Sequence, residues 1–153
     1  MSMNWNECSD AFHKDGSLRD IYVHGTTFHD WESFLSFLAS SSYQIEYVRD
    51  GEPEAIPTDA ATVFADGEHT HNLTIRVTGL SILCHFFTPE EIELDLDPRE
   101  VTSQEHLDAL LRFMSDVGAV LRHDVILTEE NGPEAVRFRY SVEEEEIKYI
   151  GIS

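Results

Sequence analysis

Residues 73–97 read LTIRVTGLSILCHFFTPEEIELDLD, and this stretch decides the fold. Apolar and polar residues alternate in three successive runs, which is the period of a half-buried β-strand. The pair at 78–79 separates the first two runs, and residues 88–90 separate the second from the third. The sequence therefore predicts a tight hairpin followed by a third antiparallel strand, at the centre of the domain.

The segment after this meander carries the strongest helical period of the chain. One apolar stripe at helical spacing comprises Leu107, Leu110, Leu111, Met114, Val117 and Leu121. Thr102 is followed three residues later by Glu105, which is the form of a capping box. A helix over 103–122 is predicted, then strands at 125–127 and 136–142. Residues 147–150 are either a hairpin partner of the last strand or a tail.

The segment before the meander predicts a strand, a helix and a second strand. Residues 21–23 form a short apolar strand, and Thr27 is a suitable N-cap for the helix that follows. The apolar stripe of this predicted helix, 28–39, consists of Trp31, Phe34, Leu35 and Leu38. A strand is expected over 43–48. Pro53 and Pro57 predict an irregular stretch after it, followed by a short helical turn.

Runs of strands with two main helices are typical of the α+β class. We expect a two-layer sandwich, in which a mostly antiparallel sheet of about six to seven strands carries the helices 28–39 and 103–122 on one face. Residues 18–153 are predicted to form this single domain. Residues 1–17 are predicted to be a polar leader, either poorly ordered or packed down by Trp5 and Phe12.

The charge balance is the most unusual bulk property. Thirty Asp and Glu residues face ten Lys and Arg residues, so the formal net charge is −20. This charge argues against nucleic acids and anionic membranes as partners, because they carry the same sign. The chain has no apolar run of membrane-spanning length and no apolar signal-peptide core, and two cysteines make no disulfide framework. A cytoplasmic location is therefore expected.

Acidic residues also follow a pattern along the third strand of the meander. Alternate positions carry Glu91, Glu93, Asp95 and Asp97, which places all four carboxylates on one face. Further acidic clusters occur at 46–54 and 143–146. Four like charges in a row repel one another and add nothing to folding. They are either a solvated surface kept for solubility, for a salty cytoplasm or to blunt a sheet edge, or a docking surface for a basic partner.

Histidines near the meander raise the question of a metal site. His69 and His71 are two residues apart, with Glu68 beside them and His85 on the next strand. Zinc needs three or four convergent ligands, and no C-x-x-C or H-E-x-x-H spacing is present. We therefore expect no metal and no cofactor, with His69 and His71 as the weak candidates. Cys84 shares its strand face with apolar neighbours and is expected to be buried and inert.

No phosphate-binding loop or nucleophile elbow is present, so no catalytic residue is predicted. In size, acidity and expected class, the chain is generically similar to small acidic immunity or inhibitor proteins of bacteria, which neutralise basic toxins, often nucleases. That similarity implies a protein-binding module that docks a basic partner through Glu91, Glu93, Asp95 and Asp97. One alternative is a small enzyme or ligand-binding domain with a pocket near His69, His71 and His85. Another is a structural protein that forms a homodimer through an apolar sheet face.

Overall fold

A single large antiparallel sheet organises the molecule. In the computed structural model, which describes residues 3–151, nine strands form one sheet in the order β3-β2-β4-β5-β6-β1-β7-β8-β9. Every neighbouring pair is antiparallel. The strands are β1 (Arg19–His24), β2 (Gln44–Arg49), β3 (Glu52–Glu54), β4 (His71–Val77), β5 (Leu80–His85), β6 (Glu91–Leu96), β7 (Val125–Glu129), β8 (Gly132–Ser141) and β9 (Glu146–Tyr149).

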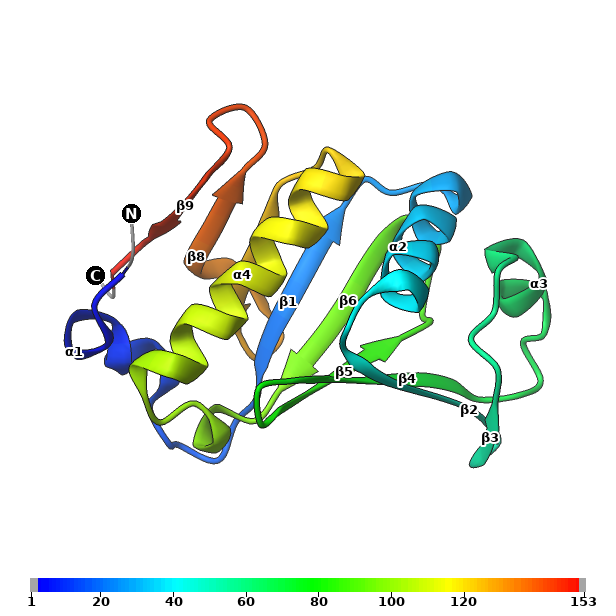
Figure 1. Ribbon diagram of the computed structural model, residues 1–153, viewed down its shortest axis with the longest axis horizontal. Helices are drawn as coiled ribbons and strands as arrows, with labels where there is room; N and C mark the ends of the chain where they lie inside the picture. Colours follow the sequence, from blue (N-terminus) through cyan, green and yellow to red (C-terminus); the bar gives the residue numbers. More distant parts are fainter. Residues whose placement is uncertain (1–2, 152–153) are drawn as a thin grey trace.

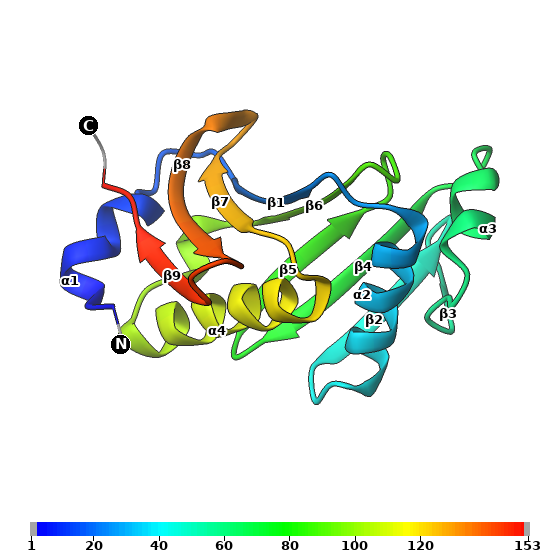
Figure 2. The same cartoon turned by 90° about the horizontal axis from the view of Figure 1, so that it is seen from above.

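Two long helices pack on the same side of this sheet. Figures 1 and 2 show α2 and α4 side by side over one face, while the strong twist of the sheet turns β2, β4 and β5 edge-on in Figure 1. The helices are α1 (Trp5–Cys8), α2 (Phe28–Ser40), α3 (Ala60–Ala65) and α4 (Gln104–Leu121), with 3₁₀ turns η1 (Ser9–Phe12) and η2 (Pro98–Glu100). The apolar stripes of α2 and α4 are buried in the core.

The central meander forms as predicted. Thr78 and Gly79 both have positive φ, at 45° and 81°, which is the backbone shape of a tight two-residue hairpin turn. This turn sets the register of β4 against β5, with Val77 opposite Leu80 and Leu73 opposite Cys84. The apolar residues of both strands therefore face the helices together.

The α+β class and the antiparallel sheet are confirmed, but the sheet is larger than the six to seven strands predicted. Pro53 led the sequence prediction to an irregular segment, whereas Glu52–Glu54 pairs with β2 at one edge of the sheet. An edge strand tolerates proline because its outer side needs no backbone donor. At the other edge, Glu146–Tyr149 pairs with β8 as a hairpin partner rather than trailing as a tail.

The long helix begins one residue later than its capping-box pattern suggests. Ser103 is the N-cap, and its side chain accepts the backbone N–H of His106. Thr102 instead places its hydroxyl 3.3 Å from Nδ1 of His106. The helix ends where Arg122 adopts a left-handed conformation with φ of 59°.

The N-terminal segment packs against the domain. Cys8, Ala11 and Phe12, all within the predicted leader, are buried in the core. Arg19, which is 1% exposed at the start of β1, donates hydrogen bonds to the backbone oxygens of Ala11 and His13 and so holds the segment against the domain.

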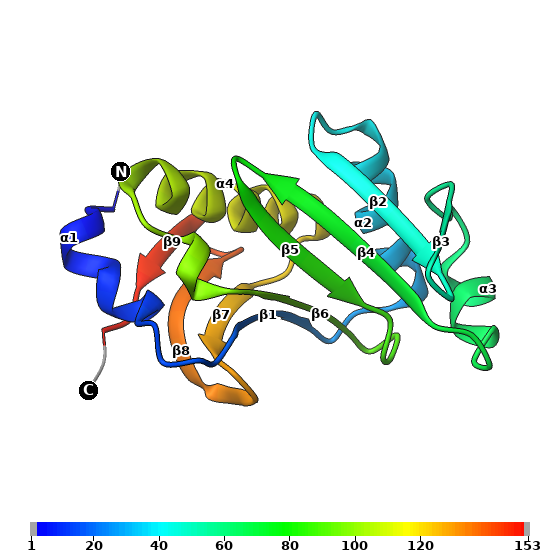
Figure 3. The same cartoon turned by 90° about the horizontal axis from the view of Figure 1, so that it is seen from below.

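Figure 3 shows α1 and α3 at opposite ends of the molecule. The division into a leader, 1–17, and a single domain, 18–153, stays a prediction. Among residues 3–151, no helix combines the length and apolar composition needed to cross a bilayer.

Candidate functional site on the open face of the sheet

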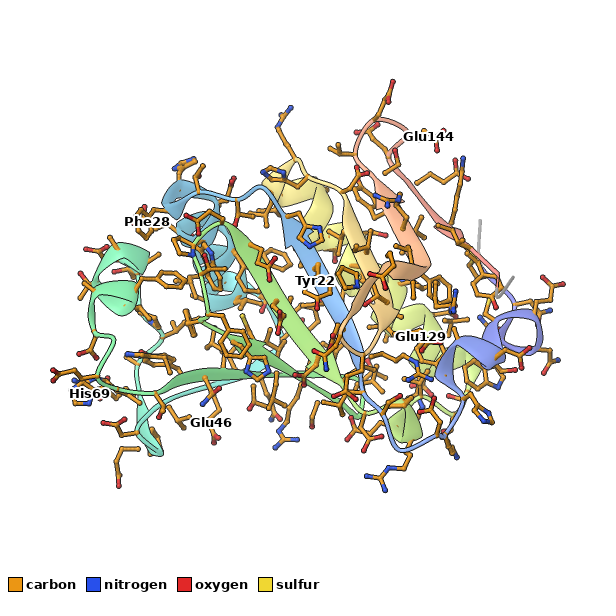
Figure 4. All side chains as sticks on the ribbon, turned by 180° about the vertical axis from the view of Figure 1, so that it is seen from behind. Tyr22, Phe28, Glu46, His69, Glu129 and Glu144 are labelled. Atoms are coloured by element: carbon orange, nitrogen blue, oxygen red, sulfur yellow. The ribbon has the colours of Figure 1, made fainter. Side chains whose placement is uncertain are left out.

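Among residues 3–151, no helix lies over the face of the sheet opposite α2 and α4, and we call it the open face (Figure 4). Along β6, buried Ile92, Leu94 and Leu96 point to the helices, and the residues between them point to the open face. The neighbouring strands contribute to the same face in register. Tyr22 of β1 and His85 of β5 both lie opposite Glu93 of β6.

The acidic row is defined as Glu91, Glu93, Asp95 and Asp97. Its three members on β6 lie on this face, and the four differ in their partners. His24 of β1 places Nε2 3.6 Å from Glu91 Oε1. His85 of β5 places Nε2 2.6 Å from Asp95 Oδ2. Glu91 and Asp95 thus each face a histidine on a flanking strand.

Asp97 has a different role from the one that its place in the row suggests. Strand β6 ends at Leu96, and Asp97 is the N-cap of η2, where it accepts the backbone N–H of Arg99 at 2.9 Å. The guanidinium of Arg99 also donates to Asp97 at 2.6 Å, and these bonds hold the pKa of Asp97 below its usual value. Asp97 therefore stabilises the η2 turn through its bonds to Arg99.

Glu93 forms no ion pair within the described residues 3–151. The histidine opposite it, His85, is bonded to Asp95, and its charge offsets only part of the rise in the pKa of Glu93. Burial raises the pKa of Glu93 above its usual value, and the nearby charges of Asp20 and Glu91 add to this shift. Ionised Glu93 is thus held in an environment that disfavours its charge.

Asp20 belongs to the same cluster and was missed by the sequence prediction. It is 5% exposed on β1, directly opposite Asp95, and accepts hydrogen bonds from the Asn131 backbone N–H at 2.8 Å and the Tyr22 hydroxyl at 3.1 Å. Burial raises its pKa. The alternation of Asp20 with Ile21 in the sequence is enough to place Asp20 on the open face. Its position beside β6 depends on which strands pair, and the local sequence does not show this.

An exposed aromatic ring borders the acidic row. Phe87 follows β5 and is 67% exposed, and its ring stacks on that of His85 with centroids 4.9 Å apart. The hydrogen bond from His85 to Asp95 raises the pKa of this histidine. A cavity of about 340 Å³ lies between β1, β7 and β8, where Tyr22, His24 and His123 contribute to its lining. The open face thus combines carboxylates with an apolar anchor.

The three histidines of the predicted pocket do not lie together. Strand pairing places His85 opposite Asn72, so His71 points to the other face of the sheet and lies near α3. His69 contacts Asp50 with 2.5 Å between Nδ1 and Oδ2. Cys84 is fully buried as its alternation predicts, and burial raises its pKa. Within the described residues, no group of three or more His, Cys, Asp or Glu side chains is arranged to hold a metal ion.

No protein-family model matches the chain, and no match to a curated protein or to a solved structure was found.

Proposed function

We propose that the chain is an acidic protein-binding module, of the immunity or inhibitor kind, that docks a basic protein on the open face of its sheet. The observation that carries this proposal is the clustering of Asp20, Glu91 and Glu93 on the open face. Their charges oppose one another and raise the pKa of Glu93. A partner that brings Arg or Lys to this cluster relieves the repulsion and gains charge-assisted hydrogen bonds.

Charge complementarity selects the class of partner. The chain carries a net charge of −20, so its field attracts a basic protein and speeds its association. Nucleic acids and a second copy of this chain fit the open face poorly, because each would bring further negative charge to Glu93. Phe87, 67% exposed at the border of the row, offers the apolar contact that hot spots in protein interfaces use.

The test is the association rate of a basic partner as a function of salt. A partner is first isolated from the native host with the wild-type chain at low salt. Its association is then compared for the wild type and a variant with Glu91→Gln, Glu93→Gln and Asp95→Asn. Asp97 stays intact in this variant because its neutralisation would break its ion pair with Arg99 and perturb η2. We expect slower association and a weaker salt dependence for the variant, with unchanged folding.

A matched control separates docking from net charge. Glu143→Gln, Glu145→Gln and Glu146→Gln remove the same number of charges from the β8–β9 turn, beside Glu144 in Figure 4. This control should retain most of the wild-type rate. The proposal is contradicted if no basic protein is retained at low salt. It is also contradicted if both variants slow association equally, since the row would then act only through the total charge.

A further inference from the structure

A second site lies on the other face of the sheet, beyond α2. A pocket of about 600 Å³ opens between β2, α3 and the segment 54–59. One polar wall is formed by Tyr47 and Arg49 of β2, His71 of β4 and Asp66, the C-cap residue of α3. Further polar residues line the rest of the pocket, namely Glu54, Thr58, Asp59 and Thr62. The apolar wall consists of Ala55, Pro57, Val63 and Ala65. The docking function proposed above uses none of these residues.

A hydrogen bond joins Tyr47 to His71, and a close ion-pair contact joins His71 to Asp66. The Tyr47 hydroxyl lies 2.5 Å from Nδ1 of His71, and Nε2 of His71 lies 3.1 Å from Asp66 Oδ2. Arg49 donates from Nε to Asp66 Oδ2 at 2.7 Å, and it lowers the pKa of that carboxyl. Nε2 of His71 has the backbone oxygen of Asp66 as its hydrogen-bond partner at 3.4 Å, beside the ionised carboxylate, and therefore carries the hydrogen. Nδ1 is then the acceptor of the phenolic hydrogen.

Burial holds this arrangement in place. The side chain of His71 is 7% exposed, and both the His71 and Tyr47 rings pack against Phe86 with centroids 6.1 Å apart. Burial also raises the pKa of Tyr47, so the phenol keeps its proton in the resting state. A reaction at the Tyr47 oxygen therefore requires a base in contact at the moment of attack, which His71 provides.

We propose that Tyr47 is the nucleophile of an acyl-transfer site, with His71 as its general base and Asp66 as the residue that positions His71. A nucleophile hydrogen-bonded to a base, with a carboxylate beside the base to orient it, is the constellation that acyl transfer uses. The substrate class is a small ester with a short apolar acyl group, which fits the apolar wall. Arg49 binds Asp66 through Nε and Nη2, which leaves Nη1 to stabilise the negative charge on the carbonyl oxygen.

The proposed reaction proceeds in two balanced steps. The Tyr47 oxygen bonds to the ester carbonyl carbon while its proton moves to Nδ1 of His71. The bond to the leaving alcohol breaks, and that proton passes to the departing oxygen, which leaves an acyl-Tyr47. A solvent water then attacks the acyl carbon and gives its proton to Nδ1. The carboxylic acid departs as the proton returns to the Tyr47 oxygen.

The probe is p-nitrophenyl acetate, with release of p-nitrophenolate followed in time and the acetylated residue located by peptide mass spectrometry. We expect an initial burst and an acetyl group on Tyr47. Tyr47→Phe, which keeps the ring packed on Phe86, should abolish the burst, and His71→Gln should slow it by about 100-fold or more. Tyr43→Phe is the matched control because burial also raises the pKa of Tyr43. It should leave the burst unchanged.

Two further variants test the positioning role. Asp66→Asn should slow acetylation of Tyr47, and Asp66→Glu should restore part of the rate, a rescue that a loss of folding would not show. Circular dichroism confirms the fold of each variant. Acetyl groups spread over surface lysines and histidines, or a burst retained in Tyr47→Phe, would overturn the proposal. Burst release from p-nitrophenyl phosphate but not from the acetate would overturn the assignment to acyl transfer.

Discussion

The covered face and the open face of the sheet are formed by the same strands but carry different side chains, apolar on the covered face and acidic on the open face. On β6, Ile92, Leu94 and Leu96 are at most 1% exposed beneath the helices. Burying such a side chain contributes about 1.5–3 kcal/mol. Glu91 and Glu93 alternate with them on the open face, where the charge of Glu91 raises the pKa of Glu93 and adds nothing to stability.

This difference separates residues that explain the fold from residues that do not. The covered face accounts for stability through burial alone. The open face carries a row of carboxylates that folding does not require. One of them, Glu93, is partly buried and forms no ion pair within residues 3–151. Selection for something other than stability is the simplest physical reason for such a surface, and each prediction below tests one side of this contrast.

The largest effect is expected for Leu110→Ala on the covered face. Leu110 is 0% exposed on α4, and removal of a buried leucine side chain costs about 2–5 kcal/mol of unfolding free energy. Denaturant melts measure the loss. Leu83→Ala is the counterpart on the open face, where the side chain is only partly buried, and should cost clearly less. A loss below about 0.5 kcal/mol for Leu110→Ala would mean that the stripe does not face the core.

The second effect tests how closely α4 approaches the sheet. Gly118 is buried on α4, and an added Cβ would collide with the ring of Tyr140 on β8 and lie 3.1 Å from the His123 backbone oxygen. Gly118→Ala should therefore destabilise the protein by about 1–3 kcal/mol through overpacking. Ala119→Ser, on the exposed side of the same helical turn, is the control for helix propensity. Equal melting of both variants would contradict this close packing.

The third effect concerns binding rather than folding. Phe87→Ala on the open face should weaken the docked complex by about 1–2 kcal/mol, because an exposed aromatic ring at the interface is a typical hot spot. Phe28→Ala is the matched control, since Phe28 is 43% exposed on α2 of the covered side. Dissociation rates measure both. Equal rates for the two variants would place the interface elsewhere.

The smallest effect is the pH dependence of the open face. The pKa of Glu93 is raised in the folded protein, so the folded state binds this proton more tightly than the unfolded chain does. Ionisation of Glu93 therefore lowers stability as pH rises from the ordinary value of 4.5 through the raised value. Glu93→Gln should stabilise the protein by about 0.2–1 kcal/mol at pH 7 and by nothing in acid.

Denaturant melts at both pH values measure this gain. Glu143→Gln in the β8–β9 turn removes the same charge from an exposed position and serves as the control. A gain at Glu93 that is equal in acid and at neutral pH would show that the raised pKa is not its source.

The local patterns of the sequence predicted most elements correctly, and the misses have physical causes. Alternation and helical stripes identified the meander and both long helices, because these periods depend on neighbouring residues alone. The strand at 52–54 was missed because proline disfavours strands except at an edge, and edge position is a tertiary property. The role of Asp97 was missed because its contact with Arg99 depends on where β6 ends.

The candidate site was predictable only in part for the same reason. The alternation along 91–95 places Glu91, Glu93 and Asp95 on one face, and the structure agrees. The approach of Asp20 to this row depends on the pairing of β1 with β6, and these strands are far apart in the sequence. A period-two pattern says which face a residue occupies and nothing about which strand lies beside it.

The sequence by itself determined the α+β class, the negative charge and the face to which each strand residue points, since all three depend on composition or on local geometry. The tertiary structure alone decided which residues meet. It separated His71 from His85 by placing them on opposite faces, and it joined Tyr47, His71 and Asp66 from β2, β4 and the end of α3. Such meetings depend on the order of strands in the sheet, which is set by the packing of the whole core and leaves no local pattern.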